Sequence, residues 1–140
     1  DGRLLHRLAG HGDLVGCVAL GEVEGVPVVA TGCDDRAARL WDARTGRALR
    51  TLRGPGGAVR AIAIGVGGAG GRPMVVAGCS DGTIHTWDAR TGVLLAVRRG
   101  RRAVRGVAIG ELGGRPVVVS ADGEAGIRFL DCGGAAGWNQ

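Results

Sequence analysis

The hexapeptide Trp-Asp-Ala-Arg-Thr-Gly stands twice in this chain, at Trp41–Gly46 and again at Trp87–Gly92. A degraded third copy, Leu130-Asp131-Cys132-Gly133, follows near the end. A proline precedes each of the three aspartates by 15 residues, and apolar runs lie on both sides of these prolines: Pro27, Pro73 and Pro116. Landmarks that recur in constant order and spacing indicate an internal repeat. The chain therefore contains three copies of one unit.

Each unit contains four short segments with the patterns of β-strands. The first two are almost uniformly apolar, as in VGCVALG from Val15 and VVATG from Val28, which is typical of strands covered on both faces. The third alternates apolar and polar residues, as in ARLW from Ala38. The fourth, GRALRTLRG from Gly46, is the most basic, and we expect it to be outermost. A repeat of four antiparallel strands in roughly 45 residues is one blade of a β-propeller.

The register of the repeats predicts where the blades begin and end. We expect blade 1 at residues 10–53, blade 2 at 54–100, the first three strands of blade 3 at 101–131 and a flexible tail at 132–140. Residues 1–9 match only the fourth segment of a unit, since Asp1-Gly2-Arg3 aligns with Thr45-Gly46-Arg47. We expect them to form the outermost strand of the blade of the third repeat, in the same chain or in a neighbouring copy.

The composition is that of a turn-rich β protein. Of the 140 residues 29 are glycine, and glycine costs about 1 kcal/mol relative to alanine inside a helix, which argues against a helical bundle. All 18 basic residues are arginine and the net charge is +5. The absence of lysine suggests a GC-rich genome.

No apolar run approaches the ~20 residues of a membrane span, and the first thirty residues lack a signal-peptide pattern. We therefore expect no membrane partner. The cysteines form no CxxC pair and lie in or beside apolar strands, so we expect them to be reduced and buried: Cys17, Cys33, Cys79 and Cys132. Reduced cysteines in turn favour a cytoplasmic protein. The chain begins with Asp1 rather than Met, which suggests a processed or excised piece.

The repeated residues resemble the motifs of the WD-repeat β-propeller family, in its glycine- and arginine-rich bacterial type, up to Asp131. The resemblance implies a hydrogen-bonded tetrad inside a complete blade, and the matching residues are His11, Thr31, Asp35 and Trp41, preceded by Gly10. The later repeats depart from this pattern. Pro55 and Ala77 replace the histidine and the hydroxyl in the second repeat, and Leu130 replaces the tryptophan in the third.

Nothing in the sequence supports an enzyme. Ser80 and Ser120 lack a nucleophile context, and phosphate-binding and zinc-peptidase motifs are absent. We expect His6 and His85 to be surface residues rather than metal ligands, and we predict neither a cofactor nor a metal. The tetrad is expected to satisfy buried polar groups rather than to catalyse a reaction.

Three blades do not close a ring, because propellers have about four to eight. Either further repeats complete the ring, in which case the chain is a fragment, or identical copies join end to end. Three copies would give nine blades and two would give six. We favour the trimer, because the small side chains of the first strands suit a wide ring.

The family resemblance implies a scaffold that binds proteins through its loops. The loops expected at the binding face carry Arg53, Arg99, Arg101 and Arg102 on one side, and Asp34, Asp35 and Ser80 on the other. An acidic protein would suit these arginines. Three alternatives remain: a docking or sensory segment of a larger bacterial regulatory protein, a piece with no partner beyond itself, and a nucleic-acid-binding module. We favour the last least, because no aromatic stacking platform accompanies the arginines.

Overall fold

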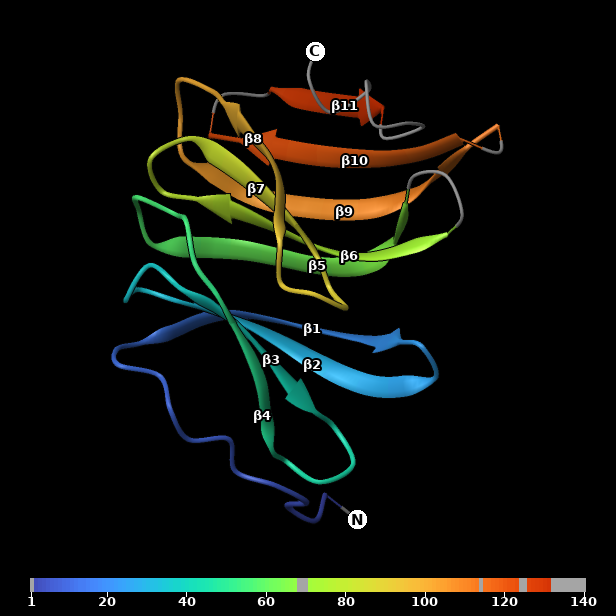
Figure 1. Ribbon diagram of the computed structural model, residues 1–140. Helices are drawn as coiled ribbons and strands as arrows, with labels where there is room; N and C mark the ends of the chain where they lie inside the picture. Colours follow the sequence, from blue (N-terminus) through green and yellow to red (C-terminus); the bar gives the residue numbers. More distant parts are fainter. Residues whose placement is uncertain (1, 68–70, 114, 124–125, 132–140) are drawn as a thin grey trace.

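A computed structural model describes residues 2–67, 71–113, 115–123 and 126–131. These residues form strands and turns, without a helix, in three antiparallel sheets stacked on one another (Figure 1). The first sheet consists of β1 (Val15–Val23), β2 (Val26–Cys33), β3 (Ala38–Asp42) and β4 (Ala48–Leu52). The second consists of β5 (Val59–Gly67), β6 (Arg72–Cys79), β7 (Thr83–Asp88) and β8 (Leu94–Arg99). The third holds β9 (Val104–Leu112), β10 (Arg115–Asp122) and β11 (Ile127–Asp131).

The prediction of an all-β fold of propeller blades is confirmed. Within each of the first two sheets the strands lie in chain order, β1-β2-β3-β4 and β5-β6-β7-β8, and the third sheet has the order β9-β10-β11. The fourth strands, β4 and β8, are outermost, as their basic character indicated. The predicted tail at 132–140 lies outside the described residues, and so does Cys132.

The repeated hexapeptide builds the same turn in blades 1 and 2. In blade 1, Asp42 Oδ1 accepts a hydrogen bond from Arg44 N, and the Asp42 carbonyl accepts one from Gly46 N, both at 2.8 Å. Gly46 has a φ of 77°, which glycine adopts without the steric cost that a Cβ brings. The equivalent residues of blade 2, Asp88 to Gly92, repeat both bonds at 2.8 Å. The hexapeptide therefore recurs because it encodes the turn that joins the third strand to the fourth.

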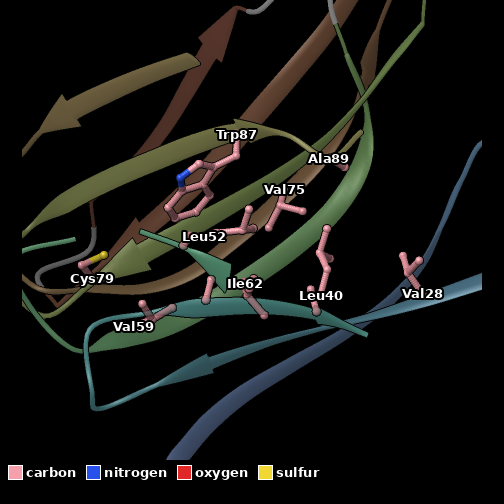
Figure 2. Packing of buried hydrophobic residues seen from close by; sticks show 12 residues of the cluster. Val28, Leu40, Leu52, Val59, Ile62, Val75, Cys79, Trp87 and Ala89 are labelled. Atoms are coloured by element: carbon pink, nitrogen blue, oxygen red, sulfur yellow. The ribbon is translucent and has the colours of Figure 1, made fainter. Parts of the chain in front are cut away.

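The blades pack on one another through apolar cores. Figure 2 shows the core between blades 1 and 2, where Leu40 and Leu52 of blade 1 meet Val59, Val75 and Trp87 of blade 2. Leu52, Val59 and Trp87 have no exposed surface. A second, smaller core joins blades 2 and 3 and contains Met74, Val76, Ile84, Val104 and Val118.

Glycines allow the first strands of neighbouring blades to approach closely. A Cβ added to Gly21 of β1 would lie 2.7 Å from the Ile64 side chain of β5, and one added to Gly65 of β5 would lie 2.8 Å from Ile109 of β9. Real Cβ atoms do not come that close, so a larger residue would push the blades apart. Part of the high glycine content therefore serves the packing between blades rather than turns.

Residues 2–14 form no strand and lie beside blade 1, at the end of the stack remote from β11 (Figure 1). The His6 ring donates a hydrogen bond from Nε2 to the Arg44 carbonyl at 2.9 Å. Among the described residues, 2–9 pair with no strand of the third sheet, so the outermost strand that the sequence predicts for residues 1–9 stays a prediction, and so does its pairing with a neighbouring copy.

The structure corrects two expectations about burial. His85 is only 3% exposed, whereas its alternating strand suggested a surface residue; all of β7 is buried because β6 and β8 flank it and a blade packs on each side. His6 is exposed, as expected. Cys33 and Cys79 are buried free thiols, but Cys17, which packs against the core between blades 1 and 2, is only half-buried.

Candidate interaction face and its buried polar network

A chain of polar side chains runs through blade 1 from its core to its surface. Thr31 on β2 is buried, and its hydroxyl accepts a hydrogen bond from Trp41 Nε1 on β3 at 2.9 Å. The same oxygen bonds Nε2 of His11, which lies in the segment before β1. The structure thus brings three of the four predicted tetrad residues into direct contact. Because Thr31 Oγ1 serves both rings, each buried N–H has a partner.

The fourth predicted residue, Asp35, reaches the histidine through an arginine that the sequence analysis did not single out. Arg39 on β3 donates from Nη1 to His11 Nδ1 at 2.7 Å and to Asp35 Oδ1 at 3.2 Å. Its Nη2 donates to Asp35 Oδ2 at 2.8 Å. An arginine donates only, so His11 Nδ1 is the acceptor and its proton sits on Nε2. The network is therefore a chain of five residues, Trp41, Thr31, His11, Arg39 and Asp35.

Charge and burial set the protonation states in this network. The Arg39 hydrogen bonds hold the pKa of Asp35 far below its usual range, so the carboxylate is ionised. Burial, and then the Arg39 charge, lower the pKa of His11 below 6.5. A neutral imidazole is the form that accepts from Arg39. The two shifts therefore favour the hydrogen-bond arrangement observed.

Three of these groups also lie at the spacing of a metal site. Ligand atoms of His11, Cys33 and Asp35 are all within 4.8 Å of one another. The Arg39 guanidinium, however, already bonds both His11 Nδ1 and the Asp35 carboxylate. A metal ion would have to displace a positive charge that satisfies both groups, so this arrangement favours a structural network over a metal centre.

In blade 2 the buried tryptophan N–H has a different hydrogen-bond partner, because the histidine and the hydroxyl of the motif are absent there. With Pro55 and Ala77 at the histidine and hydroxyl positions, Trp87 Nε1 donates to the Arg53 carbonyl at 3.1 Å. His85, paired with Ala77 as Arg39 is with Thr31, stacks on Trp87 with ring centroids 5.8 Å apart. Burial lowers the pKa of His85 and raises the pKa of the nearby Cys79 thiol to about 11. Cys79 therefore remains protonated at neutral pH and is a poor nucleophile.

The predicted interaction residues divide between separate places on the surface. Arg99, Arg101 and Arg102 line one pocket, together with Gly100 and two residues of the third repeat, Asp122 and Arg128. Arg53 does not line this pocket; its carbonyl is engaged with Trp87. The sequence analysis missed Arg128, which lies on β11, because its place beside the arginine cluster depends on the packing of the third sheet.

The acidic and hydroxyl residues of the predicted face lie at the junctions between blades. Asp34 faces Arg60 of β5 with 4.0 Å between the charged atoms. Ser80 lines a hollow with Arg60 and Arg105, and its hydroxyl accepts a hydrogen bond from Ala58 N at 3.0 Å. Asp34 therefore pairs with an arginine of the next blade, and Ser80 holds the segment that leads into β5, while Arg60 and Arg105 are exposed.

Comparison with known families agrees with the geometry. The family model described as WD domain, G-beta repeat, matches residues 2–42 and 46–88, which is more than half of the chain. The chain belongs to the WD-repeat family. WD-repeat domains typically act as non-catalytic scaffolds for protein interaction. Both matched units begin in a fourth-strand segment, at residues 2 and 46, rather than at the first strand of a blade.

A curated WD-repeat relative is the rat protein named "Ribosome biogenesis protein BOP1", which is 43% identical to the chain over 54 residues. The aligned part covers 39% of this chain and 7% of the relative. The likeness concerns repeat units rather than a whole protein. In the described part of the chain, no helix has the length and apolarity that a membrane span requires.

Replacing Thr31 by valine should destabilise the protein by about 1–3 kcal/mol, because two ring N–H groups lose their acceptor while the side-chain volume stays the same. Urea unfolding followed by tryptophan fluorescence measures the change. Thr51→Val on the exposed strand β4 is the matched control and should shift the free energy of unfolding by no more than about 0.5 kcal/mol. Equal effects of the two substitutions would contradict the network.

Stability should fall as the pH drops below about 6.5, before the carboxylates titrate. The folded pKa of His11 lies below its unfolded value, so the unfolded state binds protons first, and stability present above pH 6.5 is lost as the pH falls through the folded value. His85 contributes in the same direction. His11→Gln should therefore lose part, but not all, of the difference in unfolding free energy between pH 7.5 and pH 5. An unchanged pH dependence in this variant would refute the role of His11.

Proposed function

We propose that the chain is a non-catalytic scaffold for protein interaction that closes its propeller ring by assembling with further copies of itself. One observation carries the proposal. The sheet of blade 3 has no fourth strand among the described residues, while the segment that matches a fourth strand lies at the opposite end of the stack without a sheet to join.

The position of the N-terminal segment supports this proposal. The His6 side chain bonds the Arg44 carbonyl of blade 1, and the Arg50 side chain of β4 bonds the Arg90 carbonyl of blade 2 in the same way. Gly46 likewise packs near the His6 ring, as Gly92 packs near Arg50. Residues 2–8 thus occupy, against blade 1, the place that β4 occupies against blade 2. They lie where the outer strand of a preceding blade belongs.

We infer that the preceding blade is blade 3 of a neighbouring copy, so that residues 1–9 of one copy complete the β9–β11 sheet of the next. Among the described residues β11 is the last strand of its sheet, and the N-terminal segment of the neighbouring copy would lie beside it as the fourth strand. Three copies, giving nine blades, suit the small side chains of the first strands better than two. The free thiols among the described cysteines suit a reducing cytoplasm.

The first experiment measures the solution mass by light scattering on a sizing column. We expect about three times 14.1 kDa, and removal of residues 1–9 should give a monomer that keeps its β-type circular dichroism. A measured mass of twice the chain mass would indicate a ring of six blades instead of nine and would still support self-assembly. A wild-type monomer at every concentration would contradict the proposal and favour further repeats as the missing blades.

We further propose that the arginine pocket receives an acidic segment of a partner protein. Arg99, Arg101, Arg102 and Arg128 surround it, with Asp122 as the acidic member. Arginine forks bind carboxylates in pairs of hydrogen bonds, which favours acidic peptides. Gly100, Arg101 and Arg102 of this pocket belong to the loop that joins β8 to β9, and both arginines are exposed.

The double substitution Arg101→Ala and Arg102→Ala should weaken binding of a polyglutamate peptide by about tenfold or more, since each lost charged hydrogen bond is worth about 1.5–3 kcal/mol. Fluorescence anisotropy of the labelled peptide measures it. The charge-matched control, Arg47→Ala with Arg115→Ala, changes the opposite end of the blades and should leave the affinity unchanged. Equal losses of affinity in the two double variants would show that net charge alone causes the effect, and would contradict a binding site in the pocket. Tighter binding of an oligonucleotide, falling steeply with salt, would favour the nucleic-acid alternative.

A further inference from the structure

The first strand of every blade has one aliphatic face and one small face. The aliphatic face points toward the preceding blade, and its residues are Val18 and Leu20 of β1, Ile62 and Ile64 of β5, and Val107 and Ile109 of β9. The small face consists of the alternate positions and points toward the following blade. Its residues are Cys17, Ala19 and Gly21 of β1, Ala61, Ala63 and Gly65 of β5, and Gly106, Ala108 and Gly110 of β9.

Within the chain these two faces meet twice in the same way. Ile64 rests on Gly21, and Ile109 rests on Gly65, each close enough that a Cβ on the glycine would lie within 2.8 Å of the isoleucine side chain. The neighbouring Ile62 is 8% exposed. Each junction between blades is thus a large aliphatic side chain seated on a glycine of the preceding first strand.

At the two ends of the stack the same two faces are uncovered. Leu20, the counterpart of Ile64 and Ile109, is 75% exposed, and Val18 beside it is 67% exposed. At the other end, a Cβ added to Gly110, the counterpart of Gly21 and Gly65, would meet no atom of the described residues within 4 Å. One end therefore offers the aliphatic half of a junction, and the other end offers the glycine half.

Resting on the self-assembly of the proposed function, we propose that blade 1 of one copy docks head to tail on blade 3 of the next, with Leu20 seated over Gly110. A second copy is the partner because it carries both halves of a junction that the chain already forms twice. The contact joins two different surfaces, so it is heterologous and leads to a ring when the rotation closes. A two-fold contact of Leu20 with Leu20 would leave the glycine face uncovered.

One position makes the contact between copies looser than those inside the chain. Val59 packs on Gly32 and Val104 packs on Gly78, so closely that neither glycine has room for a Cβ. The corresponding residues at the ends are Val15, which is 48% exposed, and Ala121, whose methyl group occupies that space. The two copies must therefore sit further apart at this end, and we expect them to separate on dilution or in urea before the blades unfold.

The test uses the full chain with one half of the junction disabled at a time. Leu20→Asp places a charge on the aliphatic face, and Gly110→Leu fills the glycine face. Both positions are exposed in the single chain, so we expect both variants to fold and to be monomers. Each keeps the half that the other lacks. An equimolar mixture should therefore form a species of twice the chain mass and nothing larger, because only one productive junction is available.

Val93→Asp, at a 57% exposed valine in the turn before β8, is the matched control and should keep the wild-type mass. Near-ultraviolet circular dichroism of the tryptophans reports folding, and Leu20→Ser replaces Leu20→Asp if the charged variant unfolds. If the Leu20→Asp or Leu20→Ser variant still has the mass of the wild-type oligomer, the contact of Leu20 with Gly110 is wrong, although the chain does assemble with itself. A folded mixture that stays monomeric would overturn the head-to-tail arrangement. A wild-type monomer would overturn self-assembly itself, and with it this contact.

Discussion

The seating of an aliphatic side chain on a glycine of the preceding blade sets the distance between the blades, and the rest of the structure depends on that distance. Ile64 on Gly21 and Ile109 on Gly65 bring the first strands together so closely that a Cβ has no room. Only then can Leu52 and Trp87 be buried completely in the core between blades 1 and 2. Close packing of this kind gains dispersion energy and removes apolar area from water at the same time. The glycines of the first strands are thus required for the close packing of the blades.

The polar network of blade 1 shows how one partly buried charge becomes a structural element. Arg39 bridges His11 and Asp35 and neutralises the carboxylate, while burial and the Arg39 charge together lower the pKa of His11 and keep its imidazole neutral. Blade 2 lacks the histidine and hydroxyl positions and places a buried His85 where blade 1 has Arg39. Both solutions leave the tryptophan N–H hydrogen-bonded, which is the condition that a buried indole imposes. Different residues therefore satisfy the same physical requirement in successive blades.

The proposed assembly and the proposed partner site depend mainly on different parts of the blades. The contact between copies would involve first strands, the N-terminal segment and β11, whereas Arg99, Arg101 and Arg102 of the arginine pocket lie at the end of β8 and in the loop after it, with Arg128 of β11 common to both. A closed ring would also display that pocket once for each copy, which increases the effective affinity for a partner with several acidic segments. Self-association and partner binding can therefore be separated by substitution.

The sequence by itself determined the repeat, the four-strand pattern, the hexapeptide turn and the family, because these depend on local periodicity and on turn chemistry within a few residues. It also indicated His11, Thr31 and Trp41, since their types match a known motif. Only the tertiary structure decided that Arg39 lies between His11 and Asp35, that His85 is buried and that Arg128 joins the arginine pocket. Burial and charge contacts between strands or blades depend on which segments pack together. An alternating strand pattern does not predict whether a neighbouring blade buries its polar side chains. The glycines carry the same lesson: their number is plain in the sequence, but the isoleucine that rests on each one is visible only when the blades are stacked.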